Sequence, residues 1–484
     1  MSRFAGVAEY QLAEEAWEYL PFRFERLNGR VLVTNFVGEH VILSGSEFAL
    51  LASKELATDS PTFRRLRGKH IVRAEGDELP LELLALKTRT RYRRLPEFTG
   101  LHMFVVSLRC EHSCPYCQVS RVSQDKNRFD MSEETAAKAL DLVFRSPSQR
   151  LKIEFQGGEP LLNFPLIQRI VDEAEAINES EQRDLTFVIA TNLALLDDAV
   201  LDFCRVHDVY ISTSLDGPAD LHNKNRPRPG DDSWQRATAG IQRVREELGA
   251  DRVSALMTTT EGGLSRAREI VDTYLEQGFH NIFLRSLSPY GFAIKTKSHA
   301  AYDVDRWLAF YEEGLDYILE LNRCGTEMVE RYAAIILRKM LSNDDPGYVD
   351  LISPAGIGIG AIVYNYDGDV YASDEGRMLA EMGDTTFRLG NVHADSYADI
   401  ILSDALLAPL EASFAQSAPR CTDCAFEPFC GSDPTFHHAT QNDYVGHKAT
   451  STFCRRNMGV FGLLLDRYHG DPYTRRLFRD WARR

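Results

Sequence analysis

Three cysteines near residue 110 carry the clearest chemical signal in this sequence. They follow one another as Cys-x3-Cys-x2-Cys, at Cys110, Cys114 and Cys117. Three thiolates on one short loop can hold three corners of a cubane iron–sulfur cluster and leave the fourth iron without a protein ligand. Such an iron can bind a small chelating molecule, and Tyr116 could rest its ring against the cluster. The spacing therefore predicts chemistry at the cluster and not electron transfer alone.

Three other interpretations of these cysteines stay open. A zinc site would normally show a fourth ligand at finger-like spacing, and His112 lies inside the loop, where it could hardly close one. A Cys-x-x-Cys redox pair would leave Cys110 without a role. Chance clustering is the third.

A second group of cysteines lies near the end of the chain. It combines Cys-x2-Cys-x5-Cys spacing with one later cysteine, at Cys421, Cys424, Cys430 and Cys454. Four thiolates make a complete site, and a zinc ribbon and a 4Fe–4S cluster both fit by count. The remaining cysteines, Cys204 and Cys324, stand alone in helical stretches and are predicted to be small core residues.

The elements between residues 100 and 325 must position the first site. Strand-like runs alternate there with helical patterns such as SEETAAKALDLVF, for which Ser132 is the predicted cap; the runs are HMFVVSL, KIEF, TFVIA, VYISTSL, VSALMT and NIFLRSL. Alternation of this kind predicts a parallel sheet with helices outside. Because six units are too few for an eight-fold barrel, we expect an α/β fold with an open (β/α)6 barrel.

Polar and glycine-rich segments follow four of these strands. In parallel α/β barrels, reactive residues gather at the carboxyl ends of the strands. The first cysteines follow strand one, and the later strands are followed by Gln156-Gly157-Gly158-Glu159-Pro160, Thr191-Asn192 and Ser214-Leu215-Asp216-Gly217. Glycines there would let the backbone approach a ligand without a Cβ in the way, whereas Asp216 is predicted to form a turn.

Together these motifs resemble the radical S-adenosylmethionine (SAM) enzymes, whose signature has the same cysteine spacing and an aromatic residue at the position of Tyr116. The resemblance implies a 4Fe–4S cluster on the first three cysteines, at which one electron cleaves SAM to methionine and a 5′-deoxyadenosyl radical that abstracts hydrogen. It implies that Ser214 contacts the ribose, that Arg226 grips the methionine carboxylate bidentately, and that Leu287 packs on adenine. The full set of implied SAM contacts is Tyr116, Gln156, Gly157, Gly158, Glu159, Ser214, Arg226 and Leu287.

The C-terminal cysteines resemble the SPASM extension of such enzymes, but only in part. The usual pattern has seven cysteines for two auxiliary clusters. Here Ser373 and Pro434 stand where the family has cysteines, and another is absent around Ser353-Pro354. All three losses fall on one cluster, so the resemblance implies one auxiliary 4Fe–4S cluster, held by Cys421, Cys424, Cys430 and Cys454. Asp374 occupies the place of a catalytic base in some members.

Residues 1–95 read as a separate module. A hairpin over 30–44, helices over 46–56 and 62–67 and a strand at 70–73 predict a winged-helix-like unit. The module is similar to precursor-recognition domains, which capture a leader peptide on a strand edge. The basic stretch 87–94 is interpreted as a solvated linker. The predicted domains are 1–95 for this module, 96–325 for the barrel and 326–484 for the SPASM-like domain.

Several less general features, including SDEGRML (373–379), resemble the radical SAM maturase of the His-Xaa-Ser peptide system. That resemblance implies a ribosomally made precursor peptide as substrate, a partner radical SAM enzyme, and a reductant such as flavodoxin or ferredoxin. Three alternatives remain. They are a sulfatase-maturase-like enzyme that forms formylglycine, radical SAM chemistry on a small molecule, and a zinc-bearing peptide-binding scaffold.

The composition is that of an ordinary soluble globular protein and excludes few functions. The chain has 484 residues, 44% hydrophobic and 26% charged, and a net charge of −16. This acidity favours neither nucleic acid nor acidic membranes as partners. No apolar run approaches the ~18 residues of a membrane span, no secretory signal is expected, and nine cysteines are too few for a disulfide framework. We therefore expect a cytoplasmic protein.

Overall fold

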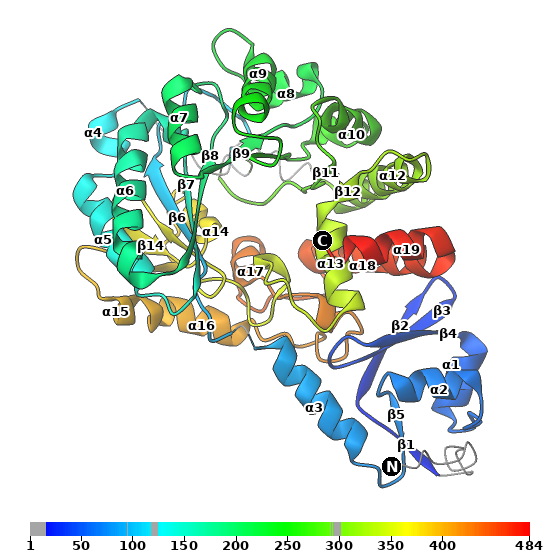
Figure 1. Ribbon diagram of the computed structural model, residues 1–484. Helices are drawn as coiled ribbons and strands as arrows, with labels where there is room; N and C mark the ends of the chain where they lie inside the picture. Colours follow the sequence, from blue (N-terminus) through cyan, green and yellow to red (C-terminus); the bar gives the residue numbers. More distant parts are fainter. Residues whose placement is uncertain (1–15, 94, 118–123, 292, 294–301) are drawn as a thin grey trace, which may run out of the picture.

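The computed structural model describes residues 16–93, 95–117, 124–291, 293 and 302–484. The first lobe of the molecule contains β1 (Trp17–Tyr19), β2 (Phe22–Leu27), β3 (Arg30–Asn35), β4 (His40–Ser44), α1 (Gly45–Ala52), α2 (Pro61–Gly68), β5 (Val72–Ala74) and α3 (Leu79–Arg91). Strands β2, β3 and β4 form an antiparallel sheet, and β1 pairs with β5. In Figure 1 this blue lobe lies apart from the barrel, and α3 runs between them.

The predicted hairpin is present as β3 and β4, and α1 begins where Ser44 and Glu47 form a reciprocal capping box. The prediction for residues 87–94 was wrong. Most of that stretch is the last part of α3, and the side chain of Arg91 is buried. Its Nη1 donates a hydrogen bond to the carbonyl of Val37 at 2.9 Å. The stretch therefore fastens α3 to the first lobe instead of lying free in solvent.

The barrel region begins at residue 101. Its elements are β6 (Leu101–Ser107), α4 (Lys126–Phe129), α5 (Glu133–Phe144), β7 (Arg150–Gly157), η2 (Pro160–Asn163), α6 (Phe164–Glu181), β8 (Asp184–Ala190), α7 (Asp198–Val206), β9 (Tyr210–Ser214), α8 (Ala219–Asn225), α9 (Ser233–Glu247), β10 (Val253–Leu256), η3 (Glu261–Gly263), α10 (Ala267–Glu276), β11 (Asn281–Ile282) and α12 (Val304–Arg323). Strands β6 to β10 are parallel neighbours in chain order. Ser132 caps α5 as predicted, by accepting a hydrogen bond from the backbone of Thr135.

The sixth predicted strand differs from the other five. Strand β11 is two residues long and pairs with β12 (Val329–Glu330), not with β10. Among the described residues, an isolated bridge between Thr259 and Ser286 links the segments that follow β10 and β11. The sheet thus carries five contiguous barrel strands, and the sixth unit closes the barrel loosely.

The C-terminal elements continue the same sheet. They are α13 (Arg331–Leu341), η4 (Val349–Leu351), β13 (Ala361–Tyr364), β14 (Asp369–Tyr371), α14 (Asp374–Ala380), β15 (Arg388–Asn391), α15 (Tyr397–Ile401), α16 (Asp404–Ala412), η5 (Glu427–Phe429), α17 (Pro434–Gln441), α18 (Thr452–Gly470) and α19 (Pro472–Trp481). Strand β13 pairs in parallel with β6, and the hairpin β13–β14 extends to β15. The complete order is β10-β9-β8-β7-β6-β13-β14-β15. Strands on both sides of the predicted domain boundary at 325/326 therefore belong to one continuous sheet.

The main core lies between this sheet and the helices outside it. Phe155 and Ile153 on β7 and Ile167 on α6 are fully buried there. Burying a side chain of this size contributes about 1.5–3 kcal/mol. Figure 1 shows α5, α6 and α7 along one side of the sheet, and α13, α17 and α18 on the other side. Among the described residues, no helix combines the length and the apolar character needed to cross a membrane.

Candidate active site

The first cysteine loop begins directly after β6. Cys110, Cys114 and Cys117 are all half-buried, and the backbone N–H of Cys117 donates to the carbonyl of Cys114 at 3.2 Å. The Gln124 amide donates to the carbonyl of Cys110 at 2.8 Å. Burial raises the pKa of the Cys114 thiol to about 12. Because thiolates are the form that binds metal, occupation of this loop would release protons.

A buried ion pair fixes the loop to the end of β9. Tyr116 donates a hydrogen bond to Asp216 Oδ2 at 2.5 Å, and Arg226 donates to both oxygens of Asp216, at 3.0 and 3.1 Å. Burial alone would raise the pKa of Asp216, but the guanidinium of Arg226 outweighs it and holds that pKa below its usual value. Asp216 is thus a buried anchor and not only the turn residue that we expected. Arg226 was predicted to bind the methionine carboxylate of SAM. In the structure, two of its N–H groups donate to Asp216.

The glycines of the second motif are required by the backbone beside them. A Cβ on Gly157 would lie 2.0 Å from the carbonyl oxygen of Ser107, and one on Gly158 would lie 2.2 Å from that of Arg109. Our explanation that these glycines make room for a ligand is therefore corrected, because the space beside them holds the chain that leads into Cys110. The Gly158 N–H also donates to the carbonyl of Ser107 at 2.8 Å.

Glu159 is completely buried and its carboxylate is satisfied by the protein. It accepts hydrogen bonds from the Thr191 hydroxyl at 2.7 Å and from the backbone N–H groups of Asn192 and Leu161 at 2.9 and 3.0 Å. Burial and the nearby carboxylate of Glu111 raise its pKa to about 7. The carboxylate therefore holds together the turns after β7 and β8.

The other predicted site residues lie at the same end of the sheet. Gln156 donates to Asp374 Oδ1 at 3.0 Å, which joins the second motif to the start of α14, and Arg377 donates to that oxygen at 3.2 Å. Leu287 packs in a small buried cluster with Tyr116. Ser214 is the last residue of β9 and is half-buried. The structure thus places Leu287 beside the cysteine loop and Asp374 beside Gln156.

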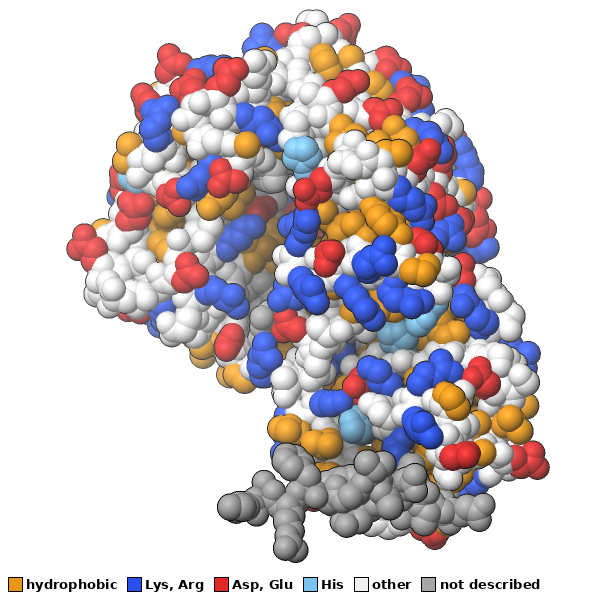
Figure 2. Space-filling view, turned by 45° about the vertical axis from the view of Figure 1, so that its right-hand side comes forward, with side chains coloured by type: hydrophobic (Ala, Val, Ile, Leu, Met, Phe, Trp, Pro, Cys, Tyr) orange, Lys and Arg blue, Asp and Glu red, His pale blue; other side chains and the backbone are white. Residues whose placement is uncertain are grey.

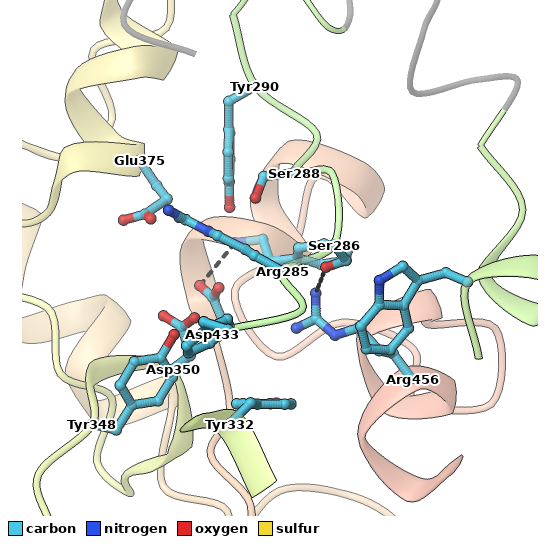
Figure 3. Close-up of a pocket in the computed structure, with 13 residues that line it drawn as sticks. Arg285, Ser286, Ser288, Tyr290, Tyr332, Tyr348, Asp350, Glu375, Asp433 and Arg456 are labelled. Atoms are coloured by element: carbon cyan, nitrogen blue, oxygen red, sulfur yellow. Dashed lines mark hydrogen bonds between the residues drawn. The ribbon is translucent and has the colours of Figure 1, made fainter. Parts of the chain in front are cut away.

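A cavity behind Asp374 contains carboxylates that sequence reasoning missed. Asp350, Glu375 and Asp433 border it, together with Arg285 and Arg456 (Figure 3). Burial and the neighbouring Asp350 raise the pKa of Glu375 to about 8 and that of Asp433 to about 7. The sequence offered one signal for this cavity, which was the second carboxylate Glu375 directly after Asp374. Asp350 and Asp433 come from distant segments and could not be connected with it.

One further group of donors lies within the first loop. The thiol of Cys110, a carboxylate oxygen of Glu111 and a ring nitrogen of His112 lie within 4.8 Å of one another. However, both ring nitrogens of His112 have partners, since Nδ1 lies 3.0 Å from Glu111 and Nε2 lies 3.0 Å from the Ser233 hydroxyl. A zinc ion on this group would have to displace one of these contacts.

The four C-terminal thiols also come together. Cys430 interacts electrostatically with the other three cysteines, so the four side chains are neighbours. The Asn457 amide donates to the Cys430 sulfur at 3.5 Å. The side chain of Lys448 is buried, and its Nζ donates to the Ser432 hydroxyl at 3.1 Å. This cation lies near Cys421, Cys430 and Cys454, where it would balance the charge of a thiolate site. With Cys424, these are the four thiols of the C-terminal group.

A buried arginine from the first lobe holds this second loop. Arg23 on β2 donates to Glu427 at 2.6 Å, and its Nε donates to the carbonyl of Thr422 at 2.6 Å. Thr422 lies between Cys421 and Cys424. The first lobe of the molecule therefore positions the loop that contains Cys421 and Cys424.

Both donor sets suit iron–sulfur clusters. The first offers three thiols on one loop, and the second offers four thiols with an amide donor and a buried ammonium group, which are contacts that tune a cluster. The family match agrees, since the model of the Radical SAM superfamily matches residues 104–282. Residues 104–282 therefore form a radical SAM domain, which spans the five parallel strands and the first cysteine loop.

Two sequence relatives illustrate the range of this match. An uncharacterised protein of Methanocaldococcus jannaschii is 35% identical over 23% of this chain and 37% of its own length, so the chain matches well under half of that relative. A serine-type anaerobic sulfatase-maturating enzyme of Bacteroides thetaiotaomicron is 22% identical over 68% of this chain and 80% of its own length.

Two solved structures share the fold. The structure of anSMEcpe with bound AdoMet and Cp18Cys peptide has a TM-score of 0.64 at 16% identity and covers 79% of this chain and 99% of that one. Streptococcus suis SuiB bound to its precursor peptide SuiA has a TM-score of 0.53 at 14% identity and covers 90% and 98%.

Proposed function

We propose that this protein is a radical SAM enzyme that modifies a ribosomally made peptide. The observation that carries the proposal is the cysteine loop after β6, whose Tyr116 is fixed by the Asp216–Arg226 pair beside the glycine turn after β7. Cys110, Cys114 and Cys117 would hold a 4Fe–4S cluster that leaves one iron for SAM. When bound, this cluster and SAM supply a 5′-deoxyadenosyl radical that abstracts hydrogen from the substrate.

The surrounding residues would bind SAM and orient it. Arg226 would face the methionine carboxylate, and Asp216 would keep its guanidinium in place. Ser214 would meet the ribose and Leu287, beside Tyr116, the adenine. The carbonyl groups around Gly157 and Gly158 would accept from the SAM amino group, and Gln156 would link that turn to Asp374. Asp374 would accept a proton released during the modification.

Two features support a peptide as the substrate. The first lobe has an antiparallel sheet in which β2 is an edge strand among the described residues, and an edge strand suits strand addition by a peptide. Its Arg23 contacts the second cysteine loop directly, so peptide recognition and that site would be mechanically joined. The fold shared with SuiB bound to its precursor peptide agrees with this use. We propose the His-Xaa-Ser type of system, with a partner radical enzyme and a flavodoxin or ferredoxin as reductant.

The C-terminal thiols would hold one auxiliary 4Fe–4S cluster, fully ligated by Cys421, Cys424, Cys430 and Cys454. With every iron ligated by protein, it would relay an electron or stabilise the fold. Formation of formylglycine, as in sulfatase maturation, is the second candidate. It is favoured by the length of the match to the Bacteroides thetaiotaomicron enzyme.

The test is reductive cleavage of SAM by the anaerobically reconstituted protein, followed by mass spectrometry of co-expressed candidate peptides. We expect about eight irons per chain, formation of 5′-deoxyadenosine, and a peptide mass shift that Cys114→Ala abolishes. Cys324→Ala is the matched control, because Cys324 is exposed at the end of α12 and not in the core, where it was wrongly predicted to lie. A mass shift that persists in Cys114→Ala, or zinc without sulfide, would contradict the proposal.

A further inference from the structure

The cavity behind Asp374 has an unbalanced set of charges. Asp350 comes from η4, Glu375 from α14 and Asp433 from the cap of α17, whereas the cations that border it are Arg285 and Arg456. Three carboxylates against two guanidinium groups leave one formal negative charge. Asp374 also faces Glu375 but is paired with Arg377 at 3.2 Å.

Arg456 has a neutral hydrogen-bond partner on the wall of the same cavity. Its Nη1 donates to the Ser286 hydroxyl at 2.8 Å, as the dashed line between these residues in Figure 3 shows. Asp433 Oδ1 accepts the backbone N–H of Phe436 at 2.9 Å and so caps α17. The charge of Arg456 acts on Asp433, whereas that of Arg285 acts on both Glu375 and Asp350, so on that side one guanidinium group stands against two carboxylates.

Two buried polar groups of the wall have no partner. Tyr290 is 2% exposed and Trp307 is 1% exposed, and neither the Tyr290 hydroxyl nor the Trp307 Nε1–H has a hydrogen-bond partner among the described residues. The Tyr290 hydroxyl points toward the space bordered by Glu375, Ser288 and Arg285 (Figure 3). A buried polar group without a partner costs about 1–3 kcal/mol, so the Tyr290 hydroxyl, which can accept a hydrogen bond, indicates a ligand that can donate to it.

We propose that this cavity holds the ε-ammonium group of a lysine in the substrate peptide, with Glu375, Asp350 and the Tyr290 hydroxyl as its acceptors. The inference rests on the proposed function and names the class of peptide.

Size and surroundings favour an ammonium group. The cavity has a volume of about 40 Å³, which admits the tip of one side chain. An ammonium group is a compact charge with three donors, whereas guanidinium is a wide planar fork. Aromatic rings line the same space, including Tyr332, Tyr348 and Phe283, and such rings attract a cation through their faces.

Protonation supports the same inference. Since burial and Asp350 raise the pKa of Glu375 to about 8, a proton occupies this carboxyl at neutral pH in the absence of a cation. A bound ammonium group would take the place of that proton. Lysine binding near neutral pH should therefore release a proton to the buffer.

The experiment measures binding of capped tripeptides to the reconstituted full-length protein by anaerobic calorimetry. The probes are Ac-Ala-Lys-Ala-NH2, its norleucine analogue, which has nearly the same shape without the charge, and its glutamate analogue. We expect the lysine probe to bind about tenfold more tightly than the norleucine probe. Its binding enthalpy should differ between phosphate and Tris buffers because of the released proton.

Variants assign the effect to the cavity. Glu375→Gln should reduce the preference for lysine to less than about threefold and remove the buffer dependence. Asp350→Asn serves as a second variant should Glu375→Gln fold poorly. Glu411→Gln removes the same charge from an exposed position on α16 and should change neither result.

Three outcomes would overturn the inference: equal binding of lysine and norleucine, preference for the glutamate probe, and no detectable binding of the lysine probe. Reductive cleavage of SAM by the same preparation is measured separately. Cleavage without a preference for lysine defeats this inference alone, whereas absence of cleavage defeats the proposed function.

Discussion

Each of the two cysteine loops is anchored by a buried ion pair between an arginine and a carboxylate. The two pairs differ in how far apart their partners lie along the chain. In the barrel, Asp216 and Arg226 are ten positions apart and lie on the turn and helix that follow β9. At the C-terminal site, Arg23 and Glu427 are 404 positions apart. The first loop is therefore positioned within the barrel itself, whereas the second depends on the first lobe. A site that needs a remote segment can be disturbed without touching its ligands.

Surroundings separate the two loops further. The carboxylates of Glu111 and Glu159 act on Cys110, whereas the buried ammonium group of Lys448 acts on Cys421. The first loop has neighbours of both signs, because the Arg226 guanidinium acts on Cys114, whereas at the second loop the strongest charge on Cys421 is the ammonium group of Lys448. Figure 2 shows acidic and basic side chains interspersed over one face of the molecule, with a hollow in its middle.

The largest expected effect separates the sites by their ligands. Cys114→Ala and Cys430→Ala should each lower the iron content from about eight to about four per chain. Only Cys114→Ala should abolish SAM cleavage, while Cys430→Ala should reduce it by less than about tenfold. Iron analysis and a 5′-deoxyadenosine assay measure both results. Equal loss of cleavage in the two variants would show that the sites do not act independently.

The next effect tests the remote anchor. Glu427→Gln leaves the Arg23 guanidinium buried without its counter-charge, which typically costs about 3–5 kcal/mol. We expect a lower melting temperature and loss of iron from the C-terminal site, with the barrel cluster retained. Asp216→Asn is the matched change in the barrel pair and should leave the C-terminal iron in place. Loss of C-terminal iron in Asp216→Asn would remove the distinction drawn between the two anchors.

The smallest effect concerns pH. The pKa of Glu375 is raised from 4.5 to about 8, first by burial and then by Asp350. Its folded carboxyl therefore keeps a proton that the unfolded chain has lost, so this contribution to stability is present below pH 4.5 and disappears as the pH rises through about 8. Between about pH 6 and pH 9, Glu375→Gln should lose roughly 1 °C less in melting temperature than the wild type. An identical slope in the two proteins would contradict the raised pKa.

The sequence predicts the strands of the barrel and the motifs that follow them, because both depend on local patterns. The run KIEF and the glycines after it define β7 and its turn, and Ser132 caps α5 as its spacing indicates. The anchoring role of Asp216 was not predictable, since Tyr116 lies 100 positions away from it. The cavity carboxylates escaped for the same reason, because only folding brings Asp350, Glu375 and Asp433 together.

Local patterns also misled in two places. The basic residues before the barrel read as a linker because their charges are typical of exposed chain, although Arg91 is buried. The glycines at 157 and 158 were interpreted as making space for a ligand, but their missing side chains allow the neighbouring backbone to pack closely. In both cases the deciding contact is with a segment that is not adjacent in sequence. Long-range packing thus overrides the local interpretation.

The pairing of β13 with β6 has a consequence for synthesis of the chain. Strand β6 leads directly into the first cysteine loop, yet one of its edges has no partner until residues 361–364 have left the ribosome. A nascent chain that ends near residue 325 would expose the edge of β6 that later pairs with β13, and an unpaired strand edge is prone to pair with other chains. Cells that make this protein would therefore gain from shielding the half-finished chain.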